Sequence, residues 1–134
     1  MSELGTIDHV ASLLESLDIK FTREENVLMM RWSTEHVKNL KVKIATNEDE
    51  SWVYIIHTFA KYYDADESKR AKLAYDMLRA SWEANGVKFA IDDDDDIILL
   101  AETNDTDLTA EEMKMLIGHL VHACDTLWEI YPRY

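Results

Sequence analysis

The chain has 134 residues, and its 27 acidic and 14 basic side chains give a formal net charge of −13, which excludes a phosphate backbone and an acidic membrane surface as favoured partners. Hydrophobic residues make up 47% of the sequence, which is typical of a packed globule, and the length predicts a single domain over residues 1–134. Cys124 is the one cysteine and the first ten residues do not resemble a signal peptide, so we expect a cytoplasmic protein.

The N-terminal part of the chain predicts one helix followed by three strands. Apolar residues recur at helical spacing from Leu4 to Leu17, which predicts an amphipathic helix over residues 3–17. In LKVKIAT (40–46) apolar and polar residues alternate, which predicts a half-buried strand. The segments NVLMMRWS (26–33) and WVYIIHTFA (52–60) are apolar on both faces and predict two more strands, of which the second is central.

A second helix is predicted to begin near DADESKRAK (64–72). Asp64 and Glu67 have the spacing of a capping box, and Asn85-Gly86 is a good helix stop.

A hairpin and a last helix complete the chain. The two strands of the hairpin are VKFAID (87–92) and DIILLAE (96–102), and Thr109 with Glu112 forms a capping box before the helix. The order α-β-β-β-α-β-β-α, with connections of hairpin length, predicts an α+β fold with a mainly antiparallel sheet packed with helices.

Five consecutive aspartates, 92–96, separate the strands of this hairpin. An EF-hand calcium loop starting at Asp92 needs glycine at its sixth position and glutamate at its twelfth, where this chain has Ile97 and Thr103. Aspartate favours turns because its side chain accepts hydrogen bonds from nearby backbone amides. We interpret the run as a solvated hairpin tip, with a weak, non-specific cation site as the alternative, and expect Asp94→Gly to be neutral or mildly stabilising.

Few residues form a pattern typical of catalysis or metal binding. His119 and His122, with Asp125 nearby, have the donor atoms for a metal, but no second ligand set accompanies them, and we expect two exposed histidines. Cys124 lies in an apolar stripe and is interpreted as a buried structural thiol, and His57 as a core or groove histidine. We therefore expect no enzymatic activity, no cofactor and no metal site.

Gly118 interrupts the last helix, where glycine costs about 1 kcal/mol relative to alanine. Close approach of another backbone would explain it. We expect that backbone to be the protein's own sheet, with a subunit contact as the alternative.

The segment LAYDMLRASWEANGVKFAIDDDDDIILLAETNDTDLTAEEM (73–113) resembles the YbjN-like family, which shares the fold of type III secretion chaperones. The resemblance extends over nearly the whole chain and rests most specifically on Asn85, Lys88, Phe89, Asp96, Leu108, Thr109, Glu111 and Glu112. Members of this family often carry glycine in the hairpin turn, where this chain has only aspartate. The resemblance implies a non-enzymatic, homodimeric, cytoplasmic protein that binds other polypeptides as a chaperone or a regulatory adaptor.

More apolar side chains are present than one layer of helices would cover, which favours a binding surface and a two-fold dimer. By the resemblance to secretion chaperones, the first-choice dimer contact is the second helix, through Ala71, Ala74, Tyr75, Leu78 and Trp82. The region of Gly118 is the second choice. The sheet face of Trp52, Tyr54 and Ile56 is expected to bind the polypeptide client. The alternative is a small-molecule or enzymatic pocket lined by Trp32, Trp52, Tyr54 and His57.

Overall fold

The computed structural model describes residues 5–134, so the first two positions of the helix expected at 3–17, Leu4 among them, lie outside the described residues. The helices are α1 (Thr6–Ser16), α2 (Arg70–Glu83) and α3 (Ala110–Ile130). The strands are β1 (Thr22–Glu24), β2 (Val27–Trp32), β3 (Leu40–Thr46), β4 (Val53–Lys61), β5 (Lys88–Ile91) and β6 (Asp96–Thr103). Short 3₁₀ turns cover Tyr62–Asp64, Glu67–Lys69 and Tyr131–Arg133.

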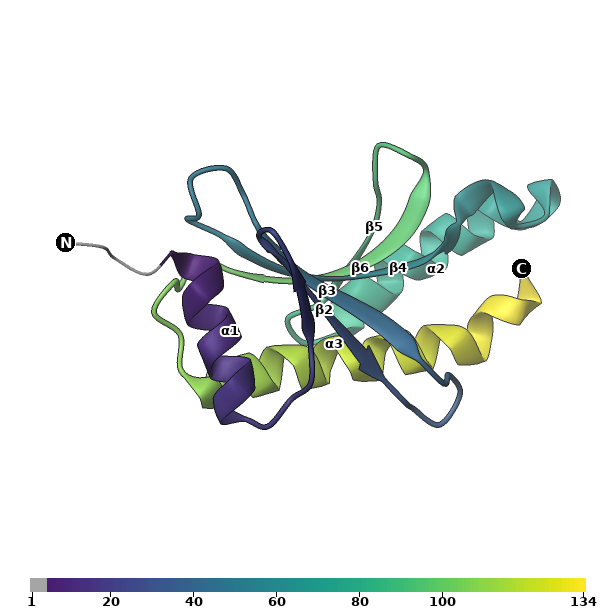
Figure 1. Ribbon diagram of the computed structural model, residues 1–134. Helices are drawn as coiled ribbons and strands as arrows, with labels where there is room; N and C mark the ends of the chain where they lie inside the picture. The colour runs from purple at the N-terminus through teal and green to yellow at the C-terminus, as the bar shows by residue number, and fades with distance from the viewer. Residues whose placement is uncertain (1–4) are drawn as a thin grey trace.

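The six strands form one antiparallel sheet in the order β1-β2-β3-β4-β6-β5. Helices α1 and α3 lie on one face of this twisted sheet, and α2 packs beside the β5 edge (Figure 1). The α+β, antiparallel architecture predicted from the sequence is therefore confirmed. No helix among residues 5–134 is long and apolar enough to cross a bilayer.

The core lies between the sheet and α3. Strand alternation turns every second residue of β2, β3, β4 and β6 toward the helices, where burial of one large aliphatic side chain contributes about 1.5–3 kcal/mol. The α3 side of the core consists of Met113, Ile117, Leu120, Ala123, Cys124 and Leu127. These residues repeat at helical spacing, so one face of α3 packs against the sheet.

Two local predictions are wrong. Strand β1 was not expected, because its three residues are all exposed and polar and it is held only by backbone pairing to β2. Helix α2 begins at Arg70, within the predicted segment 64–72, but the expected capping box at Asp64 and Glu67 is absent from that helix start. Asp66 instead accepts the Ser68 backbone N–H at 3.4 Å and caps the 3₁₀ turn that precedes α2.

The capping box of α3 is confirmed. The backbone N–H of Glu112 donates to the Thr109 hydroxyl at 3.1 Å, and the backbone N–H of Thr109 donates to the Glu112 carboxylate at 3.3 Å. This reciprocal pair satisfies two backbone donors, which a helix start otherwise leaves without partners.

The aspartate run forms the tip of the β5–β6 hairpin, as predicted. The Asp92 carboxylate accepts the backbone N–H groups of Asp94 and Asp96 at 3.0 and 2.9 Å, which is the turn-capping role expected of aspartate. Asp95 has φ of 62°, in the left-handed region that favours glycine. The turn therefore has its glycine-like position at Asp95 and not at Asp94.

We expect Asp95→Gly to raise the free energy of unfolding by about 0.5–1 kcal/mol, because it relieves a left-handed backbone and one like charge. Asp94→Gly, one residue earlier, should change stability little. Urea unfolding of both variants beside the wild type measures the difference. If both glycine variants lose stability by a similar amount, the left-handed conformation at Asp95 does not carry the strain assigned to it.

Candidate functional site

Helix α2 is apolar on two sides. Leu73 and Met77 are buried against the core, whereas Leu78 and Trp82 on another side are 71% and 84% exposed. The exposed apolar surface, called the α2 stripe below, consists of Ala71, Tyr75, Leu78 and Trp82. Steps of three and four residues place these side chains along one helix face. Ala74, which the sequence assigned to the same surface, is only half-exposed at its margin.

Polar side chains border the α2 stripe. The Lys72 ammonium lies 2.8 Å from the Asp76 carboxylate, and the Arg79 guanidinium donates to the Tyr75 hydroxyl at 3.2 Å. An apolar strip with a polar rim is the usual arrangement of a protein–protein contact surface.

The sheet face expected to bind a client lies opposite the core. Val53 and Ile55 are buried under α3, so alternation along β4 turns Trp52, Tyr54 and Ile56 to the other face. Trp52 is 37% exposed, and Tyr54 and Ile56 are half-buried. This surface is therefore apolar and partly open, as predicted.

The same alternation contradicts the alternative pocket. Trp32 and His57 point to the helix side of the sheet, whereas Trp52 and Tyr54 point to the other side. The four side chains lie on opposite faces of one sheet, so they do not line a common cavity.

A groove runs along α3 on the helix side of the sheet. Its volume is about 410 Å³, and it is called the α3 groove below. The lining residues are Ile19, Trp32, Thr34, Lys114, Ile117, Gly118, Val121, His122 and Asp125. Those on α3 extend from Lys114 to Asp125 in steps of three and four, so the groove follows the helix for roughly 16 Å. A neighbouring cavity of about 400 Å³ shares Ile19, Trp32 and Lys114 and extends the groove toward Lys20 and Arg31.

Gly118 forms part of the floor of the α3 groove. The residue is exposed, and a Cβ atom built on it meets nothing within 4 Å. The expectation that Gly118 packs against the protein's own sheet is therefore wrong. Because Gly118 has no side chain, the groove stays open at this position. The sequence did not predict the groove, because its opposite wall consists of Ile19 and Trp32, which are far from Gly118 in the chain.

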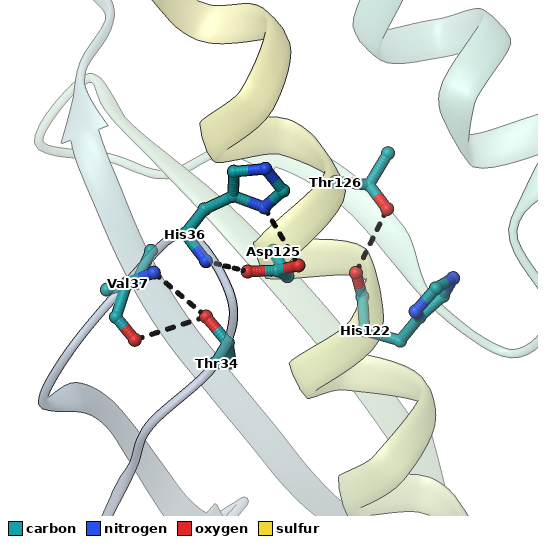
Figure 2. A network of polar contacts seen from close by, with 6 residues as sticks. All are labelled: Thr34, His36, Val37, His122, Asp125 and Thr126. Atoms are coloured by element: carbon teal, nitrogen blue, oxygen red, sulfur yellow. Dashed lines mark hydrogen bonds and ion pairs between the residues drawn. The ribbon is translucent and has the colours of Figure 1, made fainter.

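At one end of the α3 groove, Asp125 joins α3 to the loop between β2 and β3 (Figure 2). Its carboxylate accepts the backbone N–H of His36 at 2.8 Å, and its second oxygen lies 3.0 Å from the His36 imidazole Nδ1. The Thr34 hydroxyl and the two His36 donors lower the pKa of Asp125 to about 2, so the carboxylate is ionised at physiological pH. The loop is thus held onto α3.

Among residues 5–134, His119 and His122 do not form a ligand cluster with Asp125. His119 and His122 are both exposed, as expected, and the His122 ring points away from the Asp125 carboxylate (Figure 2). The partner of Asp125 is His36, 89 positions away, and no local pattern in the sequence marks this pair.

Cys124 has no features of a nucleophile. The side chain is buried, and burial raises the pKa of its thiol to about 12, so the thiol stays protonated. The interpretation as a structural core cysteine is confirmed.

His57 is a buried core histidine on β4, 6% exposed. Its Nδ1 lies 2.7 Å from the carbonyl oxygen of Lys41; because a carbonyl only accepts, this nitrogen carries the hydrogen. Burial lowers the pKa of His57 below its ordinary value, because the charged imidazolium would lose its hydration.

We expect the contribution of His57 to the free energy of unfolding to fall as the pH is lowered from about 7.5 to about 5. A histidine whose folded pKa is depressed contributes stability that is fully present above the unfolded pKa near 6.5 and is lost below it, because only the unfolded chain binds the proton. Urea unfolding of the wild type and His57→Gln at both pH values tests this. The advantage of the wild type should shrink at the lower pH, and a constant advantage contradicts the assignment.

No family model matches the chain, and no curated protein matches its sequence. Solved structures do resemble it. The ExsC–ExsE complex gives a TM-score of 0.69 at 13% identity, covering 95% of this chain and 96% of that chain. YbjN from E. coli gives 0.63 at 13% identity, covering 94% and 92% of the two chains. SycH, a type III secretion chaperone of Yersinia pestis in complex with a YscM2 fragment, gives 0.61 at 17% identity, covering 91% and 98%.

The structural similarity extends over almost the full length of each chain. The sequence identity of 13–17% is too low to assign a function, so the similarity shows the fold alone. They agree with the six-stranded antiparallel sheet and three helices described above. The chain therefore has the YbjN-like fold of type III secretion chaperones.

Proposed function

We propose that this protein is a non-catalytic, cytoplasmic, homodimeric protein that binds another polypeptide, as a chaperone or a regulatory adaptor. The observation that carries the proposal is the α2 stripe, in which Leu78 and Trp82 are mostly exposed on a chain of net charge −13. Contiguous apolar side chains of this size on a soluble protein mark a contact surface, because water would otherwise hydrate them at a cost.

The α2 stripe suits a second copy of the same chain. A two-fold axis brings one helix face against its own copy, so a single apolar stripe supplies both halves of the contact. Tyr75 and Trp82 each bury about 150–250 Å² when covered, and the polar rim around Lys72 and Arg79 stays in water. The similarity of fold to secretion chaperones supports the same arrangement.

The α3 groove suits the client. Its walls are apolar, Lys114 with Lys20 and Arg31 supplies positive charge at one end, and Asp125 supplies negative charge at the other. A segment with apolar residues three or four positions apart would place them along the roughly 16 Å of the groove. Among the similar structures, one is described as a chaperone–effector complex, which supports a polypeptide as the occupant. The sheet face of Tyr54 and Ile56 offers a second, flatter surface for the rest of the client.

A small molecule is the second candidate occupant of the α3 groove. About 410 Å³ falls within the size range of ligand pockets. Trp32, Ile117 and Val121 give the groove apolar walls, which suit a mainly apolar ligand.

Co-purification of the tagged protein from its native lysate, followed by mass spectrometry, separates the candidates. A specific polypeptide that is lost with Gly118→Trp, and kept with Gly118→Ala, supports client binding in the α3 groove. A metabolite with the same dependence supports the second candidate. If nothing binds in a Gly118-dependent manner, the groove has neither role.

A further inference from the structure

The loop between β2 and β3 places metal-ligating side chains next to α3. Glu35, His36 and Asp125 each offer one ligand atom, and these atoms all lie within 4.8 Å of one another. The set contains one imidazole nitrogen and two carboxylate oxygens. Zinc and related divalent transition metals bind this combination of donors.

We propose that Glu35, His36 and Asp125 form a surface site for a divalent transition-metal ion of the zinc class, which fastens the β2–β3 loop to α3. The site departs from the expectation of no metal site, which rested on sequence spacing alone. It is independent of the dimer, because none of its ligands belongs to the α2 stripe. Asp125 also lines the α3 groove, so zinc binding is measured directly on the chain without a client.

The spacing of the ligand atoms suits one ion. His36 Nδ1 and the nearer Asp125 oxygen are 3.0 Å apart, and two ligand atoms on a tetrahedral zinc ion with bonds of about 2.0–2.1 Å lie about 3.3 Å apart. A small rotation of the imidazole, whose Nδ1 edge faces the carboxylate, therefore admits the ion between them (Figure 2). The three protein ligands leave one position for water.

The surrounding hydrogen bonds hold these ligands in place. The backbone N–H of His36 donates to the other Asp125 oxygen at 2.8 Å, which orients the carboxylate independently of the imidazole. The Thr34 hydroxyl accepts the Val37 N–H at 3.0 Å and the Thr34 backbone N–H donates to the Val37 carbonyl at 2.7 Å, which closes the loop that carries Glu35 and His36. Such outer contacts raise metal affinity because they fix the ligands before the ion arrives. Zn²⁺ takes the place of the hydrogen between His36 Nδ1 and Asp125, and the displaced proton leaves to solvent.

A second group of converging side chains, Asp92, Asp94 and Asp96 at the hairpin tip, is a competing site in any titration. It contains carboxylates only, and Asp92 already accepts two backbone hydrogen bonds. An ion of the zinc class prefers a site with nitrogen donors over one with carboxylates alone. The hairpin tip therefore serves as the internal control.

Calorimetric titration of the chelator-treated full chain with Zn²⁺ tests the site. We expect one ion per chain with micromolar affinity, at least about 10-fold weaker in Glu35→Gln and abolished in His36→Ala and Asp125→Asn. Glu35 is exposed, so Glu35→Gln leaves the fold intact and gives a readout even where the other variants unfold. Asp94→Asn and His119→Ala should bind Zn²⁺ like the wild type.

Hydrogen exchange gives a second readout. At a Zn²⁺ concentration near the dissociation constant of the wild type, Zn²⁺ should slow exchange of the backbone amides in residues 33–39 of the wild type and slow it much less in Glu35→Gln. The proposal is overturned if no zinc binds, in which case His36 and Asp125 form an ion pair only. It is equally overturned if Asp94→Asn removes the binding, or if Glu35→Gln and His36→Ala both retain it.

Discussion

Leu78→Asp is expected to convert the dimer into a 15.6 kDa monomer. Leu78 is 71% exposed at the middle of the α2 stripe, so the substitution leaves the fold of the subunit intact. In a two-fold contact it places two like charges in an apolar interface, where an unpaired buried charge costs about 3–5 kcal/mol. The dissociation constant of the dimer should therefore rise at least about 100-fold. Light scattering at micromolar concentration measures the change.

Met115→Asp is the matched control for this experiment. Met115 is 59% exposed on α3, so it carries a similar apolar side chain outside the α2 stripe. Its substitution should leave the dimer unchanged. If Met115→Asp dissociates the dimer and Leu78→Asp does not, the contact lies on α3 near Gly118, the second choice. A wild-type protein that scatters as a monomer refutes the dimer itself.

Gly118→Trp is expected to abolish client binding in the α3 groove. The indole would rise from the groove floor into the space that the absent Cβ leaves open, and it would fill much of the 410 Å³. Displacing the occupant in this way should weaken binding at least about 100-fold, or about 2.7 kcal/mol. Fluorescence anisotropy with a labelled peptide of the polypeptide identified by co-purification measures the affinity.

Gly118→Ala separates the groove from the fold. A methyl group at this position meets no atom within 4 Å, so it should fit without displacing a neighbour. Alanine favours the helix by about 1 kcal/mol over glycine, and the variant should unfold at a correspondingly higher urea concentration. It should keep the client. Equal affinity of the wild type and Gly118→Trp would show that the client binds elsewhere, with the sheet face of Tyr54 and Ile56 as the next surface to test.

The element order followed from the sequence because strand and helix periodicities are local. In β3, alternation of apolar and polar residues specified which side chains face the core, and the structure buries Leu40, Val42 and Ile44 as the pattern requires. Strand β4 is apolar on both faces, so the packing decided that Val53 and Ile55 face the core. The capping box at Thr109 likewise marked the start of α3 from four neighbouring positions. Strand β1 lacked such a signal, because its pairing uses only the backbone, which every residue except proline provides.

The candidate surfaces needed the tertiary structure. Helix α2 carries Leu73 and Met77 on one side and Leu78 and Trp82 on another, so its hydrophobic pattern alone does not tell which side faces water. That choice is made by β5 and the core, against which only the side of Leu73 and Met77 packs. The apolar residues of the α2 stripe were therefore recognised in the sequence, and their exposure was decided by the fold.

The sequence by itself determined the α+β element order apart from β1, the aspartate hairpin and the apolar setting of Cys124, because each depends on neighbours within a few positions. Only the tertiary structure decided that Gly118 opens a groove and that Asp125 meets His36 and Glu35, since these residues belong to segments that approach one another only when the sheet and α3 pack together. The packing of the whole core determines which distant segments approach one another, and a local pattern of residues does not predict such contacts.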